Sequence, residues 1–327
     1  MPKFAWLASH ESYQPEVLID QAVLADKAGF DMVTASDHFH PWVDDNSAAG
    51  FVWAWLGAAA ARTDSLMFAT SVTCPLFHYH PALIAQAAAT VDRLSGGRFV
   101  LGVGTGENIN EGPLGYEFPG YAERIRRMRE ALEIIHRLLA GEKLDFEGAY
   151  YQCRKAKLYS PPTNGVPIWM AAGGEKSATF AGKNTEGLIV SVKEPEEALE
   201  KIIKPFQGNR DSRGSVMATR WVVLAGSDAE AWDALGSMRG LRAPGRLEEV
   251  DPMVLRQRAD EMDRDEILSK YAVVKDAAGL IEAYRHLVTD VEADVVSIQV
   301  ASTHPDRTIS MIGTEVLPEL RKLGDSP

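Results

Sequence analysis

The side chains best suited to catalysis lie at residues 36–42, where a serine, an aspartate, two histidines and a tryptophan occur within one short segment. Histidine changes its charge near neutral pH, and a neighbouring carboxylate can orient its ring, so Asp37 and His38 are candidates for acid–base chemistry. The same two residues could instead be a helix cap and a histidine whose hydrogen bonds are satisfied within a loop. Their own sequence does not separate the two interpretations.

The position of this segment favours the catalytic interpretation. It directly follows residues 30–35, an apolar run typical of a buried parallel strand. Four further strand-like runs, at 67–72, 98–103, 166–170 and 188–192, are followed by Cys74, Glu107, the pair Gly173-Gly174 and Lys193 respectively. The carboxyl ends of parallel strands meet at one edge of a sheet or barrel, so we expect these residues to gather at a single site.

Strands alternate with amphipathic helices through most of the chain, and eight strands are predicted. Apolar residues recur at helical spacing in residues 15–29, 48–62, 81–94 and 121–139. The last strands are predicted at 217–224 and 294–298, and the closing helix at 307–323. This α/β pattern favours a (β/α)8 TIM barrel, with an open doubly wound sheet as the alternative.

Two segments depart from the alternation and are predicted to be insertions. Residues 143–160 resemble a small hairpin with its turn at Glu147-Gly148. Residues 237–270 are rich in Arg, Asp and Glu and are predicted to be helical. We expect both to belong to a single domain that covers residues 1–327.

Composition excludes several classes of protein. A net charge of −12 argues against a nucleic-acid partner, which normally requires a basic face. No apolar run approaches the roughly 18 residues of a membrane span, so no membrane partner is expected. Cys74 and Cys153 provide neither a disulfide framework nor a metal-spaced set, and the pair His78 and His80 lacks a further nearby ligand, so we expect no metal. The chain begins directly with a strand-like segment and lacks a signal-peptide plan, which predicts a cytoplasmic protein.

The glycines of residues 102–107 do not form a nucleotide fingerprint, because the pattern is GxGxGE and not GxGxxG. They more readily let the backbone approach a flat ligand, at which Glu107 would place a carboxylate. The pair Gly173-Gly174 opens a helix near Glu175 and could bind a phosphate there, although a simple tight turn explains it as well.

Four motifs, in this order and spacing, resemble the luciferase-like superfamily: residues 36–42 (SDHFHPW), 70–75 (TSVTCP), 102–111 (GVGTGENINE) and 171–174 (AAGG). Within it, the chain most resembles the glucose-6-phosphate dehydrogenases that depend on coenzyme F420, a deazaflavin. The resemblance implies a (β/α)8 barrel with insertions, a homodimer, and hydride transfer from the anomeric carbon of glucose 6-phosphate or a related sugar phosphate to F420. FMN is the alternative cofactor.

The resemblance also assigns roles to residues. It implies a non-proline cis peptide at Ser71-Val72 and catalytic roles for His38 as base and Glu107 as acid, with Trp42 and Glu11 as positioning groups. The cofactor contacts that it implies are Asp37, Ser71, Val72, Cys74, Glu107, Asn110, Ala172, Gly173 and Gly174. Many relatives that oxidise sugar phosphates carry threonine where this chain has Cys74, whereas relatives acting on simple alcohols carry cysteine.

A sugar phosphate requires fixed positive charges, and the resemblance places Lys193, Arg246 and Lys270 at the family's three basic positions. Each alone would more often be a solvated surface charge. Because Arg246 belongs to the late insertion, we expect it to lie away from the base and from the cofactor face.

Three other functions compete with this assignment. A secondary alcohol dehydrogenase is favoured by Cys74 and by the aromatic pair Trp53 and Trp55, and is opposed by the three basic residues. A flavin-dependent monooxygenase of the same superfamily is the second. A non-catalytic binding protein is the third, and the placement of both His38 and Glu107 argues against it, because binding alone needs neither group.

Overall fold

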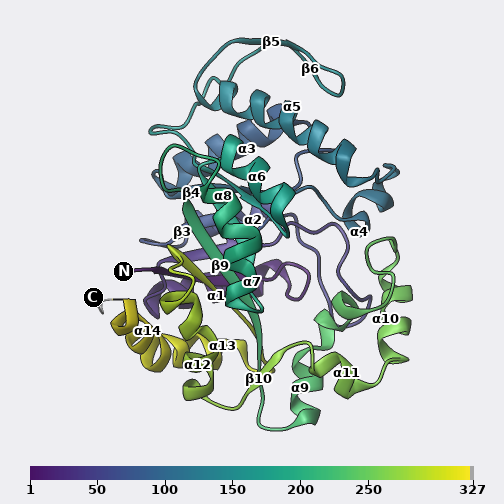
Figure 1. Ribbon diagram of the computed structural model, residues 1–327, viewed down its shortest axis with the longest axis vertical. Coiled ribbons are helices and arrows are strands. Elements are labelled where there is room, and N and C mark those ends of the chain that lie inside the picture. Colours follow the sequence, from purple (N-terminus) through teal and green to yellow (C-terminus); the bar gives the residue numbers. More distant parts are fainter. Residues whose placement is uncertain (325–327) are drawn as a thin grey trace.

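Eight parallel strands close into a barrel in the computed structural model, which describes residues 1–324 (Figure 1). In order around the barrel, the strands are β1 (Lys3–Ala8), β2 (Met32–Ala35), β3 (Met67–Thr70), β4 (Phe99–Val103), β7 (Ile168–Ala171), β8 (Gly187–Ser191), β9 (Ser215–Leu224) and β11 (Val295–Ala301). The sheet closes because β11 pairs with β1, and β9 pairs with both β8 and β11. The predicted (β/α)8 barrel is confirmed, and the open sheet is excluded.

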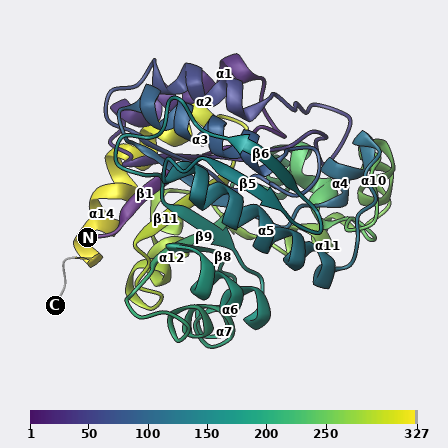
Figure 2. The ribbon, with the colours of Figure 1, turned by 90° about the horizontal axis from the view of Figure 1, so that it is seen from above.

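Helices surround the strands, with α1, α2 and α3 on one side of the barrel and α6, α7 and α12 on the other (Figure 2). The helices outside the insertions are α1 (Pro15–Lys27), α2 (Val52–Ala60), α3 (Pro81–Ser95), α4 (Asn108–Glu111), η1 (Gly112–Leu114), α5 (Tyr121–Leu139), α6 (Glu175–Asn184), α7 (Pro195–Ala198), η2 (Leu199–Ile203), α8 (Lys204–Gln207), α12 (Ala277–Thr289), α13 (Pro305–Met311), η4 (Ile312–Val316) and α14 (Leu317–Gly324). None of the helices in residues 1–324 is both long and apolar enough to cross a membrane.

The ends of α3 show how local chemistry sets these boundaries. The Nδ1 atom of His80 accepts a hydrogen bond from the Ala82 backbone N–H, and Pro81 occupies the first turn, where its missing N–H costs nothing. Gly96 ends the helix in the left-handed conformation at φ 69°, which glycine adopts without steric strain. Similar signals explain why most predicted helices agree with the structure within a few residues.

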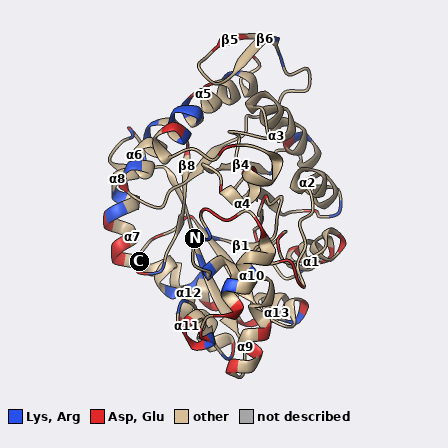
Figure 3. Ribbon diagram, turned by 90° about the vertical axis from the view of Figure 1, so that its right-hand side faces the viewer, with Lys and Arg blue, Asp and Glu red and all other residues tan. Residues whose placement is uncertain are grey.

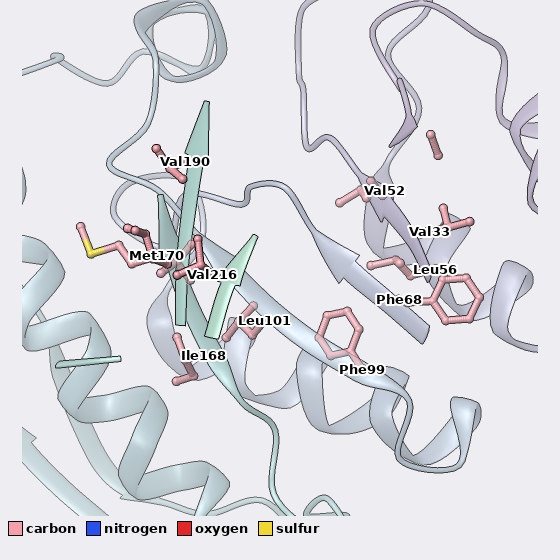
Figure 4. Packing of buried hydrophobic residues seen from close by; sticks show 14 of the residues in the cluster. Val33, Val52, Leu56, Phe68, Phe99, Leu101, Ile168, Met170, Val190 and Val216 are labelled. Atoms are coloured by element: carbon pink, nitrogen blue, oxygen red, sulfur yellow. The ribbon is translucent and has the colours of Figure 1, made fainter. Parts of the chain in front are cut away.

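The main core lies between the strands and their covering helices. Leu56 of α2, Phe68 of β3 and Phe99 of β4 belong to this core, and all three are fully buried or nearly so (Figure 4). Burying a side chain of this size contributes about 1.5–3 kcal/mol. The outer helices carry Lys, Arg, Asp and Glu side chains, with both signs of charge interspersed (Figure 3).

The predicted hairpin is present as β5 (Leu144–Glu147) and β6 (Gln152–Ala156), but its turn is longer than expected and covers residues 148–151. The carboxylate of Glu130, on α5, accepts hydrogen bonds from the backbone N–H groups of residues 149–151. This long-range cap draws the turn away from Glu147-Gly148, where the local sequence predicted it.

The second insertion is helical, as predicted, and contains η3 (Gly236–Arg242), α10 (Pro252–Asp260) and α11 (Arg264–Leu268), preceded by α9 (Asp228–Ala234). A short strand that was not predicted, β10 (Ala272–Val274), pairs with the end of β9. The predicted closing helix is divided into α13, η4 and α14.

Side chains fix the second insertion over the loop that follows β2. Arg239 donates to both carboxylate oxygens of Asp45, at 2.9 and 2.8 Å, and Arg256 donates to Asp44 at 2.6 Å. Gly240 lies so close to the backbone of Trp42 that an added Cβ would lie 2.1 Å from the Trp42 carbonyl oxygen. The insertion therefore forms a wall beside the loop that carries His38.

Candidate active site

A cavity of about 460 Å³ lies at the carboxyl ends of the barrel strands. It gathers most of the predicted catalytic and cofactor-binding residues, namely Glu11, Asp37, His38, Trp42, Ser71, Val72, Cys74, Glu107, Asn110, Ala172 and Gly173. Gly174 lies at the start of α6 and does not line the cavity. The chain segments that follow β1, β2, β3, β4 and β7 thus meet at one site. Their positions in the sequence predicted this for the last four, whereas Lys193, which was predicted to join them from the end of β8, does not line the cavity.

A bulge at the end of β3 shapes one side of this cavity. Residue pairing with β4 runs from Ala69–Val100 to Thr73–Val103, so the β3 side carries one extra residue. The Ser71-Val72 peptide bond within the bulge is cis, in agreement with the resemblance. A Cβ at residue 104 would lie 2.5 Å from Val72 Cγ2, so Gly104 leaves the room that the bulge needs beside the cavity.

Asp37 is held by two hydroxyl groups. Thr73 donates a hydrogen bond to Oδ2 of Asp37, and Tyr79 donates one to Oδ1 at 3.2 Å. Burial raises the pKa of the Asp37 carboxyl, and the hydrogen bond from Thr73 opposes this rise. Burial and the adjacent Asp37 also raise the pKa of Tyr79, which therefore keeps its proton and acts as a donor. These contacts fix the residue that precedes His38.

The ring of His38 is oriented so that one nitrogen can act as a base. Its Nδ1 lies 3.0 Å from the carbonyl oxygen of His40, and a carbonyl only accepts hydrogen bonds. Nδ1 therefore carries the proton of the neutral ring, and Nε2 keeps its lone pair for a ligand proton. The ring of Trp42 packs edge-on against His38, with 5.3 Å between the ring centroids, and restricts its rotation.

Glu11 is almost fully buried, and its Oε2 accepts a hydrogen bond from the Ser36 hydroxyl. That hydroxyl in turn accepts a hydrogen bond from the backbone N–H of His10, at 2.9 Å. Behind them, burial lowers the pKa of His10 to about 4, and its ring packs edge-on against Trp55. A neutral, buried histidine thus supports the segment that places Glu11 at the cavity.

Glu107 contacts the second insertion. Its Oε1 accepts a hydrogen bond from Arg246 Nη1 at 3.1 Å, which leaves Oε2 available to a ligand. The guanidinium of Arg246 also lies 5.5 Å from the centre of the Trp42 ring. The expectation that Arg246 lies away from the base and the cofactor face is wrong, because the insertion folds back over the loop after β2.

Cys74 borders a contact between a histidine and a buried glutamate that the sequence analysis did not anticipate. His78 Nδ1 lies 2.7 Å from Glu111 Oε2, and the Glu111 side chain is fully buried. Burial, followed by the nearby charge of Glu111, raises the pKa of the Cys74 thiol well above its ordinary value. Cys74 is therefore a neutral thiol at the cavity wall and not a nucleophile.

The side-chain amide of Asn110 forms hydrogen bonds to the protein backbone through its oxygen. Its Oδ1 accepts hydrogen bonds from the backbone N–H groups of Phe39 and His40, at 3.0 and 3.4 Å. Its Nδ2 has no partner within residues 1–324 and remains the end available to a ligand. The turn between β7 and α6 contains Gly173 and Gly174. A Cβ added to either glycine would meet no atom within 4 Å, so the space above this turn is open.

The three predicted phosphate-binding residues do not all meet. Arg246 and Lys270 line a second cavity of about 280 Å³, which shares Leu241 and Arg242 with the main one. Lys193 is exposed after β8 and lines neither cavity. Trp53 and Trp55 belong to the main core and do not line the cavity either, so they give no support to an alcohol substrate.

Several cavity residues were missed because they lie inside strands or in the insertion. Four of them lie in barrel strands: Ser191 in β8, Thr219 and Trp221 in β9, and Gln299 in β11. Arg242 lies in η3 of the insertion. Polar residues within otherwise apolar strands were the available signal, because the inside of a barrel strand faces the site near its end. Within residues 1–324, no group of three His, Cys, Asp or Glu side chains is arranged to hold a metal ion.

Comparison with known proteins agrees with this arrangement. Residues 3–291 match the family model described as luciferase-like monooxygenase. The chain is 35% identical to the F420-dependent glucose-6-phosphate dehydrogenase of Microbacterium testaceum over 98% of both chains. It is 36% identical to the protein of the same name from Mycolicibacterium smegmatis, over 86% of this chain and 87% of that one.

Two solved structures extend the comparison. An F420-dependent secondary alcohol dehydrogenase in complex with an F420–acetone adduct superimposes with a TM-score of 0.90 and 30% identity, over 98% of this chain and 100% of that one. The F420-dependent tetrahydromethanopterin reductase of Methanopyrus kandleri, 19% identical with a TM-score of 0.75 over 98% of this chain and 99% of its own, shares the fold. The chain belongs to the luciferase-like monooxygenase family.

Proposed function

We propose that the protein is a dehydrogenase that depends on coenzyme F420 and oxidises glucose 6-phosphate, or a related sugar 6-phosphate, at its anomeric carbon. The observation that carries the proposal is the orientation of the His38 ring, whose Nδ1 faces the His40 carbonyl, at a cavity that is also lined by the bulge and by glycines. Full-length relatives named for this activity support the assignment.

The cavity walls suit a flat ring system such as a deazaflavin. Gly104, Gly106 and Gly173 present backbone without side chains to the cavity, and Val72 stands in the bulge beside them. The Nδ2 of Asn110 and the backbone of the Ala172-Gly173 turn provide polar groups at the edge. Asp37, Ser71, Cys74, Glu107 and Gly174 complete the proposed set of contacts. FMN, another flat ring system, remains the alternative cofactor.

Coenzyme F420, when bound, accepts the hydride that leaves the anomeric carbon of the sugar. His38 takes the hydroxyl proton of the substrate at Nε2 while the carbon–oxygen double bond of the lactone forms. Glu107 holds, at Oε2, the proton that balances the hydride on the cofactor. Trp42 holds the His38 ring, and Glu11, fixed through Ser36, positions the polar groups around the substrate.

The phosphate of the substrate is assigned to the insertion side of the cavity. Arg246 and Lys270 line the smaller cavity there and supply two positive charges. Lys193 belongs to the proposal as a third charge, on the family resemblance. Charge-assisted hydrogen bonds of this kind contribute about 1.5–3 kcal/mol each.

A secondary alcohol dehydrogenase is the second candidate, because one specific comparison favours it. The alcohol dehydrogenase that binds an F420–acetone adduct superimposes closely, and Cys74 is the residue type carried by alcohol-oxidising relatives. The positive charges of the insertion oppose it, because a simple alcohol has no anion to pair with them.

Loss of the visible absorbance of F420 during incubation with a panel of substrates tests the proposal. We expect reduction of F420 with glucose 6-phosphate and slow or no reduction with glucose, 2-propanol or 2-butanol. Reduction by the alcohols alone would establish the second candidate. Replacing F420 by FMN in the same assay, with oxygen present, tests the monooxygenase alternative.

The proposal includes two further parts, of which the first rests on the family resemblance. We expect a homodimer, which size-exclusion chromatography with light scattering measures directly. We also expect a cytoplasmic location, which fractionation of the source cells followed by immunoblotting tests. A monomer that turns over the sugar phosphate would remove the first part and leave the enzyme assignment intact.

A further inference from the structure

A small cavity beside the main one collects positive charge. It has a volume of about 280 Å³ and is lined by Arg242, Arg246 and Lys270, with Glu248 as an acidic member of the same wall. Leu241 and Arg242 line both cavities, so the small cavity opens next to the main one. A ligand in the main cavity can therefore extend an anionic group toward these charges.

Arg242 differs from its neighbours in having no carboxylate partner within residues 1–324. The other buried or half-buried arginines of the insertion each form an ion pair, namely Arg239 with Asp45 and Asp260, Arg246 with Glu107, Arg256 with Asp44 and Asp260, and Arg258 with Glu249. The Lys270 ammonium lies 3.1 Å from Glu266. A guanidinium that has no acidic partner can bind the anion of a ligand without first breaking an ion pair within the protein.

The surroundings of Arg242 restrict its position and leave one of its hydrogen-bond donors without an acceptor in the described residues. Its guanidinium carbon lies 4.9 Å from the centre of the Tyr271 ring, a cation–π contact that restricts the position of the group. Its Nε is buried and has no hydrogen-bond partner within residues 1–324. The Tyr271 hydroxyl is buried beside it and interacts with the Arg242 side chain. Within the described residues, the buried Nε of Arg242 is therefore a donor that lacks an acceptor.

We propose that Arg242 binds the anionic end of the substrate at the junction of the two cavities, together with Arg246 and Lys270. The proposal rests on the proposed function, because it assigns a further residue to the phosphate of the same substrate. A planar guanidinium that is held against an aromatic ring can grip two phosphate oxygens at once, whereas Lys270 acts as a point charge. Arg242 thereby adds to the preference for a phosphorylated over an unphosphorylated sugar.

The test compares Arg242→Gln with Arg242→Lys and with the matched control Arg264→Gln. Arg264 lies in the same insertion, stacks on Trp232 at 4.8 Å and lines neither cavity. We expect Arg242→Gln to raise KM for glucose 6-phosphate by about tenfold or more, with kcat changed less than about twofold. Arg242→Lys should recover part of the loss, and Arg264→Gln should behave as the parent. An equal rise in KM for both glutamine variants would overturn the proposal.

Two binding measurements separate this inference from the assigned activity and from the cofactor. Inorganic phosphate should raise the thermal unfolding midpoint of the cofactor-free parent, and less so that of Arg242→Gln. The Kd for F420, followed by its fluorescence without substrate, should be the same for both. If none of the sugar phosphates tested leads the parent to reduce F420, the proposed function fails. The titration with inorganic phosphate still decides whether the anion site exists. No phosphate-dependent stabilisation of the parent, or a weakened Kd for F420 with an unchanged KM, overturns the role of Arg242.

Discussion

The two walls of the active-site cavity are built on different physical plans. In the barrel wall, which includes Glu11, Asp37 and the bulge at Ser71-Val72, the two carboxylates are held by hydrogen bonds from neighbouring hydroxyl groups. The insertion wall presents half-buried cations, of which Arg246 reaches across to Glu107 and Arg242 has no acidic partner within residues 1–324.

The difference indicates a division of labour. A closed hydrogen-bond network cannot change its partners without leaving buried polar groups unsatisfied, so the barrel wall fixes geometry. Half-exposed cations exchange partners at little cost, because water and mobile carboxylates can replace one another around them. The insertion wall is thus suited to a ligand that arrives and leaves in each turnover. The following experiments break one wall at a time.

The largest effect is expected from His38→Ala in the barrel wall. Removing the only ring nitrogen assigned to the substrate proton should lower kcat by about a hundredfold or more, because general bases contribute 10²–10⁴-fold. The Kd for F420, measured by fluorescence, should change little, since the base acts on the substrate. His136→Ala on α5, a histidine bonded to the Asn184 carbonyl on the outside of the barrel, serves as control. Turnover near that of the parent at neutral pH would refute the assignment of the base.

The barrel wall should also impose a pH dependence on stability through His10. Its pKa is about 4 in the folded protein and about 6.5 in an unfolded chain, so only the unfolded chain takes up a proton between these values. The unfolding free energy should therefore fall as the pH drops from about 6.5 to about 4, by about 3 kcal/mol in total from this group. Urea unfolding of His10→Gln against the parent should show a smaller loss over this range. His304→Gln, at an exposed position, is the control; identical slopes for all three proteins would contradict the assignment.

The smallest effect is expected from Lys270→Ala in the insertion wall. Lys270 lines the small cavity, and within residues 1–324 its side chain forms an ion pair only with Glu266 of α11. Its removal should raise KM for glucose 6-phosphate about tenfold and leave kcat and the unfolding free energy unchanged. Arg246→Ala should raise the same KM and also lower kcat, since Arg246 contacts both Glu107 and Trp42. Equal effects of Lys270→Ala on phosphorylated and unphosphorylated sugars would indicate damage to the fold.

Much of the barrel wall could be predicted from the sequence, because its residues follow strands that local periodicity identifies. The strand ends at Ala35, Thr70 and Val103 place Asp37, Cys74 and Glu107 at one rim without any knowledge of the packing. The insertion wall could not be predicted in the same way. The contact of Arg246 with Glu107 and the bond of Asn110 to the backbone of Phe39 join segments far apart in the chain, and no local pattern encodes them.

The way in which the second insertion is attached to the barrel affects how substrate specificity can change during evolution. Residues 236–270 are attached to the loop after β2 by the side chains of Arg239 and Arg256 and by the tight contact at Gly240. Apart from the short strand β10 that follows them, they take no part in the sheet. Mutations in this segment can therefore accumulate without disturbing the register of the barrel, provided that those anchors persist. A lineage with this architecture can acquire new substrates by changing one continuous stretch of its gene, while the cofactor it inherited stays the same.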